Sequence, residues 1–177
     1  RMRQLRIENR RLRRMQQALT TMNQQARLLA ANVVARSPDL SSMTITLDRG
    51  TRHDLNPQSI VVDGAHLIGR ITEVGPLATA TTLLSGRPFE AIALNERDQD
   101  LTRLSPDAIE SLIDVPRLVL QPDEADPEQL VTPVESESPI EPGHTIRLVD
   151  ADWPDAAQYL VVGRVVAVRP LEGQWKQ

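Results

Sequence analysis

The stretch Ile60-Val-Val-Asp-Gly-Ala-His-Leu-Ile-Gly-Arg-Ile-Thr-Glu-Val74 decides the fold class. Two apolar runs flank the pair Asp63-Gly64, and such a pair between apolar runs is a strong signal for a β-hairpin turn. Gly69 interrupts the second run, as glycine does where a strand bulges or bends sharply. Residues 60–62 and 67–74 are therefore expected to form adjacent strands.

Further short strands are expected on both sides of this hairpin. Met43, Ile45 and Leu47 alternate with threonines, which places them on one face of a strand. The other strand candidates, each bounded by turn residues, are 78–84, 89–94, 118–120, 130–131, 145–149 and 160–168. Short strands at this spacing predict small barrels or sandwiches. Gly50, Gly75 and Gly163 are predicted, with Gly64 and Gly69, to be structural turns or bends.

The N-terminal region has a helical pattern instead. Residues 2–34 lack Gly and Pro, and their apolar side chains follow an a/d heptad repeat with Glu8 as the one polar d position. Because the apolar stripe is narrow, pairing with a second copy is favoured, while packing of the helix on its own domain is the alternative. The predicted dimer seam is Leu5, Leu12, Met15, Leu19, Met22 and Leu29.

The predicted fold class is mainly β, with an N-terminal coiled-coil helix followed by two small β-barrel-like domains. The expected boundaries are a helix at 1–36, a first barrel at 37–95, a connecting segment with a short helix at 96–116 and a second barrel at 117–177. Pro122 to Gly143 contains seven acidic residues and no basic one, which is typical of exposed loops.

Composition excludes several classes of function. The chain has 177 residues and no cysteine, so disulfides, thiolate metal sites and a cysteine nucleophile are excluded. Its four aromatic residues are too few for a base-stacking platform.

The charge of the chain is unevenly distributed. Residues 1–14 hold seven Arg and one acid, a local charge of +6. The total is −4, so the rest of the chain carries −10. A nucleic-acid phosphate backbone would be repelled by that acidic remainder, so no nucleic-acid partner is predicted.

No catalytic or metal motif is evident. A Ser/His/Asp triad could be drawn from Ser85, His53 and either Asp63 or Asp98, but Ser85 lacks the Gly-rich surroundings of an oxyanion hole. His66 beside Leu67 is interpreted as a strand residue and not as a ligand. The sequence therefore predicts a protein that is not an enzyme and that has no cofactor and no metal.

The segment 45–86 resembles the MreC family of bacterial rod shape-determining proteins. Leu47-Asp48-Arg49-Gly50 is similar to the family's first Gly turn, and Gly64-Ala-His-Leu-Ile-Gly-Arg-Ile-Thr-Glu-Val74 is similar to its "G-L-V-G-x-V-x-x-V" motif. Thr82-Leu-Leu-Ser-Gly86 follows where the family has "V-x-L-L-T-D". Leu160-Val-Val-Gly-Arg-Val165 lies where the family has "G-I-P-V-G-K-V".

This resemblance implies a membrane-anchored scaffold that dimerises and organises the peptidoglycan elongation machinery on the outer side of the inner membrane. It implies MreD, a class B penicillin-binding transpeptidase and RodA as partners.

No segment of the sequence approaches the ~20 apolar residues that cross a bilayer. Because the chain opens at Arg1 within a helical pattern, we expect a preceding segment, with a membrane anchor as one candidate.

Two other functions are alternatives: a periplasmic adaptor of an export system and a basic-helix nucleic-acid-binding protein. Export adaptors insert a helical hairpin within the β-rich part, whereas here one helix precedes all the strands, which favours the scaffold. The partner surface is predicted on the first barrel, at Leu67, Ile68 and Arg70, because the motif match is strongest there.

The seam can be tested by charge. Changing both Leu12→Lys and Leu19→Lys places cations at the centre of the predicted interface, so the dimer is expected to separate into monomers while the β-domains stay folded. Sedimentation velocity on the double variant measures this. An unaltered dimer would mean that the copies meet elsewhere.

Overall fold

The computed structural model describes residues 27–37, 43–82, 87–95, 115–126, 128–135 and 137–169. Over these ranges the chain is mainly β, as predicted, with two single-turn 3₁₀ helices, η1 (Thr51–His53) and η2 (Asp155–Ala157). The strands are β1 (Val33–Arg36), β2 (Thr44–Leu47), β3 (Ile60–Asp63), β4 (His66–Val74), β5 (Ala78–Thr82), β6 (Phe89–Leu94), β7 (Leu118–Pro122), β8 (Leu130–Val131), β9 (Thr145–Leu148) and β10 (Val161–Arg164).

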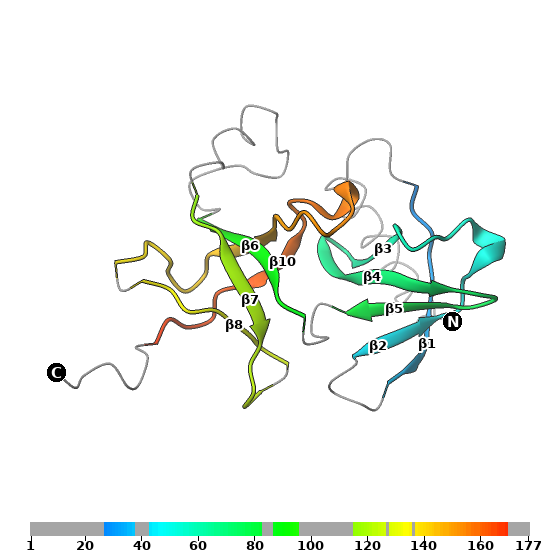
Figure 1. Ribbon diagram of the computed structural model, residues 1–177, viewed down its shortest axis with the longest axis horizontal. Helices are drawn as coiled ribbons and strands as arrows, with labels where there is room; N and C mark the ends of the chain where they lie inside the picture. The colour runs from blue at the N-terminus through cyan, green and yellow to red at the C-terminus, as the bar shows by residue number, and fades with distance from the viewer. Residues whose placement is uncertain are drawn as a thin grey trace, which may run out of the picture.

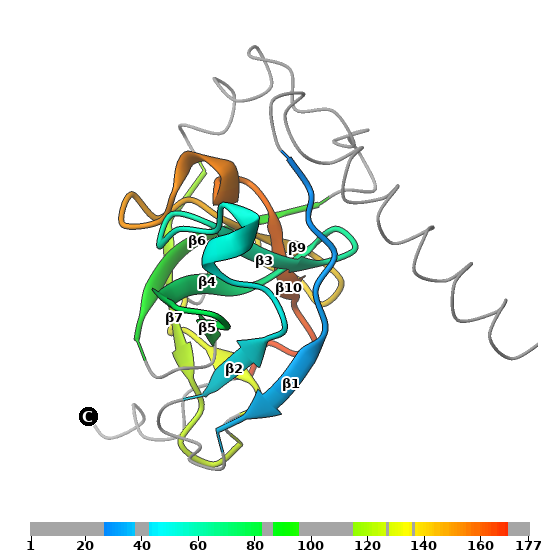
Figure 2. The same cartoon turned by 90° about the vertical axis from the view of Figure 1, so that its right-hand side faces the viewer.

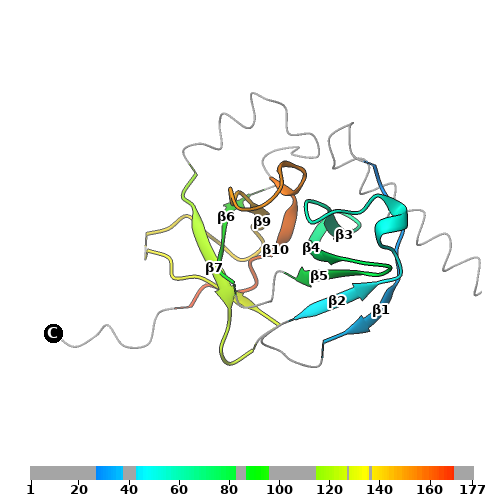
Figure 3. The same cartoon turned by 45° about the vertical axis from the view of Figure 1, so that its right-hand side comes forward.

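The strands form two lobes along one continuous hydrogen-bonded path. Its order is β1-β2-β5-β4-β10-β9-β6-β7-β8, and β3 pairs with β4 beside it. Figures 1 and 3 show β1 to β5 on one side of the molecule and β6, β7 and β10 on the other. Neighbours along the path pair antiparallel except β4 and β10, which run parallel where the two lobes meet.

The first lobe has a small core of alternating strand residues. Ile45 and Leu47 of β2 are buried with Ile71 of β4 and Ala78 and Ala80 of β5. The intervening threonines of β2 are only partly buried, as the alternation in the sequence predicted. Ala78 and Ala80 of β5 are completely buried in this core.

The second lobe has the larger core, and β4 contributes to it as well. Leu67, near the start of β4, is buried in that core, whereas Ile71, four residues later, belongs to the first. The other buried members are Phe89, Ala91, Leu118, Leu120, Ile146, Leu148, Ala157 and Leu160. A single strand therefore supplies a buried side chain to each of the two cores.

The β3–β4 turn lies one residue later than the Asp63-Gly64 pair suggests. Asp63 pairs with His66, so the two loop residues are Gly64 and Ala65. Gly64 has φ +63°, and a positive φ at the first loop position is the type II′ arrangement that favours glycine. The pairing register shifts once between Val61 and Val62, which makes Ile68 an extra residue in β4, beside Gly69.

Three expectations from the sequence are wrong in the described ranges. Residues 27–36, assigned to the helix, contain no helix, and β1 pairs there with β2. The boundary at 95 is misplaced, because β6 pairs with β7 and β9 of the second lobe. The last strand ends at Arg164 and not at 168. The expected helix within 96–116 falls almost entirely outside the described residues.

Gly69 permits the closest approach of β4 to β5. A Cβ at this position would overlap the Thr81 carbonyl oxygen and lie 2.9 Å from the Thr82 Cα, and both atoms are backbone that cannot swing aside. Gly69→Ala is therefore expected to lower the free energy of unfolding by about 1–3 kcal/mol, the usual scale of overpacking. Thermal or denaturant unfolding measures the loss.

Gly163 in β10 offers a matched control. A Cβ there meets nothing within 4 Å, so Gly163→Ala is expected to leave stability unchanged or slightly raised. Equal melting of Gly69→Ala and wild type would contradict the close approach of β4 and β5.

Candidate interaction surfaces

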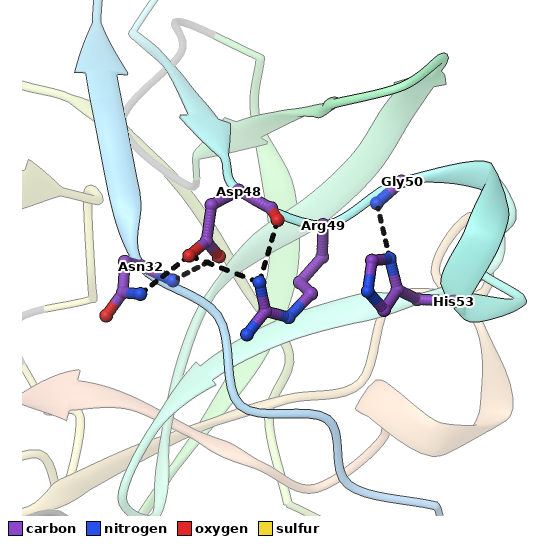
Figure 4. A network of polar contacts seen from close by, with 5 residues as sticks. All are labelled: Asn32, Asp48, Arg49, Gly50 and His53. Carbon is purple, nitrogen blue, oxygen red and sulfur yellow. Dashed lines mark hydrogen bonds and ion pairs between the residues drawn. The ribbon is translucent and has the colours of Figure 1, made fainter.

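The segment before β1 is fastened to the first lobe by Asn32 and Asp48 (Figure 4). The Asn32 backbone N–H donates to Asp48 Oδ1 at 2.8 Å, and the Asn32 side-chain Nδ2 donates to Asp48 Oδ2 at 2.6 Å. In return, the Asp48 N–H donates to the Asn32 carbonyl at 3.0 Å. Three hydrogen bonds, two of them to a carboxylate, hold one residue pair, and bonds to charged groups are the stronger kind.

Arg49 and the following turn support this carboxylate. Arg49 Nη1 lies 3.2 Å from Asp48 Oδ2 and donates to the Asp48 carbonyl at 2.9 Å. Gly50 is buried, and a side chain there would collide with the carbonyl groups of Gly75 and Pro76. The Gly50 N–H points to His53 Nδ1 at 3.4 Å, so that ring nitrogen has a structural use within its own turn.

A second contact at the start of the segment is much weaker. Arg27 Nη1 and Asp54 Oδ2 are 3.1 Å apart, but both side chains are largely exposed. Exposed ion pairs contribute little to stability. The segment that enters β1 is therefore held to the first lobe mainly at Asn32.

β1, which follows this anchor, carries two exposed apolar side chains. Val33 and Val34 are both exposed, and the pairing of β1 with β2 shifts register beside them, between Val33 and Ala35. All four residues of β1 are exposed, and β1 is the first strand of the sheet path. The other large exposed apolar residues are Leu29, Leu77, Val119, Val131, Val166 and Val168.

The surface predicted at Leu67, Ile68 and Arg70 is not a free surface. Leu67 is only 2% exposed, within the second core, so its assignment to a partner surface was wrong. Ile68 is partly buried against the first core. Arg70 is partly buried, and its Nη1 donates to the Asp152 carbonyl at 2.7 Å. Strand alternation could not reveal this, because β4 is covered by one core after the other.

The predicted dimer seam falls mostly outside the described residues, namely Leu5, Leu12, Met15, Leu19 and Met22. Leu29 is described, and it lies in an extended segment and not in a helix. It therefore cannot continue a helical seam from residues 1–26.

The two described residues of the hypothetical triad, His53 and Asp63, lie in a turn and at a hairpin. His53 accepts from its own turn, and Asp63 ends β3 at the hairpin; Ser85 and Asp98 lie outside the described ranges. Among the described residues, no group of three or more His, Asp and Glu side chains could hold a metal ion. Within the same ranges, no helix is long and apolar enough to span a membrane.

The sequence reasoning missed two groups of residues that matter here. Asn32 and Asp48 carry no local signal, because each residue type is common in loops. Trp153 and Asp152 lie in the turn-rich stretch 150–155, whose composition indicates a loop but not the strand that it contacts.

Comparison with known proteins follows from this geometry. The family model "Rod shape-determining protein MreC, barrel core" matches residues 33–174, most of the chain and all ten strands. The chain belongs to the MreC family. No curated protein sequence matches it.

Solved MreC structures share this fold at low sequence identity. A structure titled "MreC" is 19% identical with a TM-score of 0.69, covering 96% of this chain and 86% of that one. MreC from Pseudomonas aeruginosa is 18% identical with a TM-score of 0.62, covering 84% and 85%. The major periplasmic domain of the cell shape-determining filament MreC is 17% identical with a TM-score of 0.52, covering 83% and 84%.

The anchor before β1 can be tested by comparing its two contacts. Asn32→Ala removes a side-chain bond to the Asp48 carboxylate and is expected to lower the free energy of unfolding by about 1–2 kcal/mol. Arg27→Ala, which removes the exposed pair with Asp54, is expected to change it by less than about 0.5 kcal/mol. Urea unfolding of both variants gives the comparison, and an equal effect would show that the two contacts anchor the segment equally.

Proposed function

We propose that this protein is a non-catalytic cell-shape scaffold that organises the peptidoglycan elongation machinery at the inner membrane, on its periplasmic or extracytoplasmic side. The observation that supports this best is the match of the MreC barrel core to residues 33–174. One relative of the same fold is described as the periplasmic domain of a cell shape-determining filament. The family name itself states a role in determining rod shape.

The use of polar side chains in the described residues supports a scaffold over an enzyme. Asp48 and Asp150 accept backbone N–H groups, and His53 accepts from Gly50. A catalytic acid or base needs a site beside a substrate, whereas these groups bind their own loops. Their chemistry is used to hold the β-lobes in shape.

Dimerisation through residues 1–26 is part of this proposal. The heptad pattern favours a coiled coil, and the Asn32–Asp48 anchor would hold the β-lobes in a constant direction relative to it. A membrane anchor preceding Arg1 would then place two copies side by side. The expected partners are MreD, a class B penicillin-binding transpeptidase and RodA.

We place the transpeptidase contact on β1 of the first lobe. A strand at the end of a sheet path offers backbone N–H and C=O groups to an added strand, and the exposed side chains of Val33 and Val34 would contact that strand. This replaces Leu67, which is buried, as the centre of the partner surface on that lobe.

The test uses two valines that are equally exposed. Val34 of β1 and Val119 of β7 are both 54% exposed, so a lysine is tolerated sterically at either position. In cells depleted of the endogenous protein, full-length wild type is expected to restore rod shape and to co-precipitate the transpeptidase. Val34→Lys is expected to lose both, because a charge interrupts the apolar contact beside the added strand.

Val119→Lys is the matched control and is expected to behave as wild type. Loss of binding with Val119→Lys and not with Val34→Lys would move the contact to the second lobe. Failure of wild type to restore rod shape would overturn the scaffold proposal itself.

A further inference from the structure

The two lobes are joined along β4 and its partner strand β3. One junction is the parallel pairing of β4 with β10, where Val161 pairs with His66 and the adjacent Leu67 enters the second core. Ile60 and Val62 of β3 pack against the same core. Apolar packing is non-directional, so a polar attachment farther along β4 adds a directional restraint on the orientation of the lobes.

This polar attachment is made by Arg70. Its guanidinium donates from Nη1 to the Asp152 carbonyl at 2.7 Å, and its Cζ lies 5.1 Å from the centroid of the Trp153 ring. This distance is within the range of a cation–π contact. Trp153 in turn packs against the core of the second lobe. Arg70 follows His66 by four residues, about 13 Å along a strand.

The loop that receives Arg70, residues 149–160, is internally braced. Asp150 Oδ2 accepts from the Glu90 N–H at 3.0 Å, and Asp150 Oδ1 accepts from the Asp152 N–H at 2.8 Å. Gln158 Nε2 donates to the Asp150 carbonyl at 2.7 Å and to the Trp153 carbonyl at 3.1 Å. The carbonyl and the ring that meet Arg70 are therefore held in place from within the second lobe.

The end of the loop is held by a buried cation. Arg147 of β9 is only 6% exposed, and its Nη1 donates to the Tyr159 carbonyl at 2.7 Å. Tyr159 has φ +62°, a conformation that costs a non-glycine residue energy and persists only where its surroundings enforce it. Its N–H donates to the Leu148 carbonyl at 2.7 Å. In Figures 1 and 2 the resulting loop, in orange, lies beside β3 and β4 of the first lobe.

We propose that Arg70, bound between the Asp152 carbonyl and the Trp153 ring, is an inter-lobe latch that sets the orientation of the two β-lobes. The β4–β10 pairing stays in place when Arg70 is released. The loop that binds Arg70, residues 149–160, is held by hydrogen bonds within the second lobe. Opening the latch widens the range of angles between the lobes, while Leu67, Ile60 and Val62 keep their apolar contacts with the second core. A partner that touches both lobes then meets either one rigid surface or two surfaces whose relative angle varies.

The absence of cysteine allows a direct measurement. Val34→Cys in the first lobe and Val119→Cys in the second are exposed positions for nitroxide spin labels. Labelled full chain is diluted with unlabelled chain, so that only distances within one copy are recorded by pulsed electron paramagnetic resonance. The protein with Arg70 intact is expected to give one narrow distance distribution, and Arg70→Ala is expected to lose it and give a broad or shifted one.

A second variant and a control separate the latch from general destabilisation. Trp153→Leu keeps apolar packing on the second core but removes the aromatic ring, and it is expected to broaden the distribution as Arg70→Ala does. Arg117→Ala removes an ion pair of 2.7 Å with Glu90 inside the second lobe and is expected to leave the distribution narrow.

Calorimetry shows whether each variant is folded. Because β4 supplies buried side chains to both cores, wild type, Arg70→Ala and Trp153→Leu are each expected to melt in one cooperative transition. A distribution as narrow as that of wild type in both folded variants would overturn the latch. Neither measurement depends on the scaffold function or on its partners.

Discussion

The double role of β4 is the constraint on which the rest of the structure depends. Leu67 enters the core of one lobe and Ile71 enters the core of the other, so neither core is complete without this strand. Gly69 lies between them and lets the β5 backbone pass at close range. Because packed interiors tolerate little change in volume, each lobe restricts the position of the other through these three residues.

Polar contacts hold the segments that lie outside the two cores. Asn32 and Asp48 hold the chain entering β1, and Asp150 and Gln158 hold the loop that meets Arg70. In both places a side chain satisfies backbone groups that regular pairing leaves without a strand partner, which is the ordinary requirement for irregular segments close to a core. These residues explain how a small β protein of the MreC family presents defined loops with little aromatic material.

The two ends of the sheet path differ in chemistry. β1 has exposed valines, whereas β8 lies between stretches that contain seven acidic residues and no basic one. An apolar strand and an acidic surface suit partners of different chemistry, because charge gives specificity to an interface.

Sequence alone determined most of the strands and the mainly β class, because hairpin pairs, alternation and turn glycines act over a few residues. Ile45 and Leu47 are buried as their alternation indicates, and Gly64 has the positive φ that its turn requires. The helical expectation was wrong for Val33–Arg36, since that segment takes its conformation from pairing with β2. Only the tertiary structure decided that β6 belongs to the second lobe, that Leu67 is buried and that Arg70 meets Asp152, 82 residues away in the chain. Such contacts leave no local signature, because each partner satisfies ordinary strand or loop chemistry until the folded chain brings the two together.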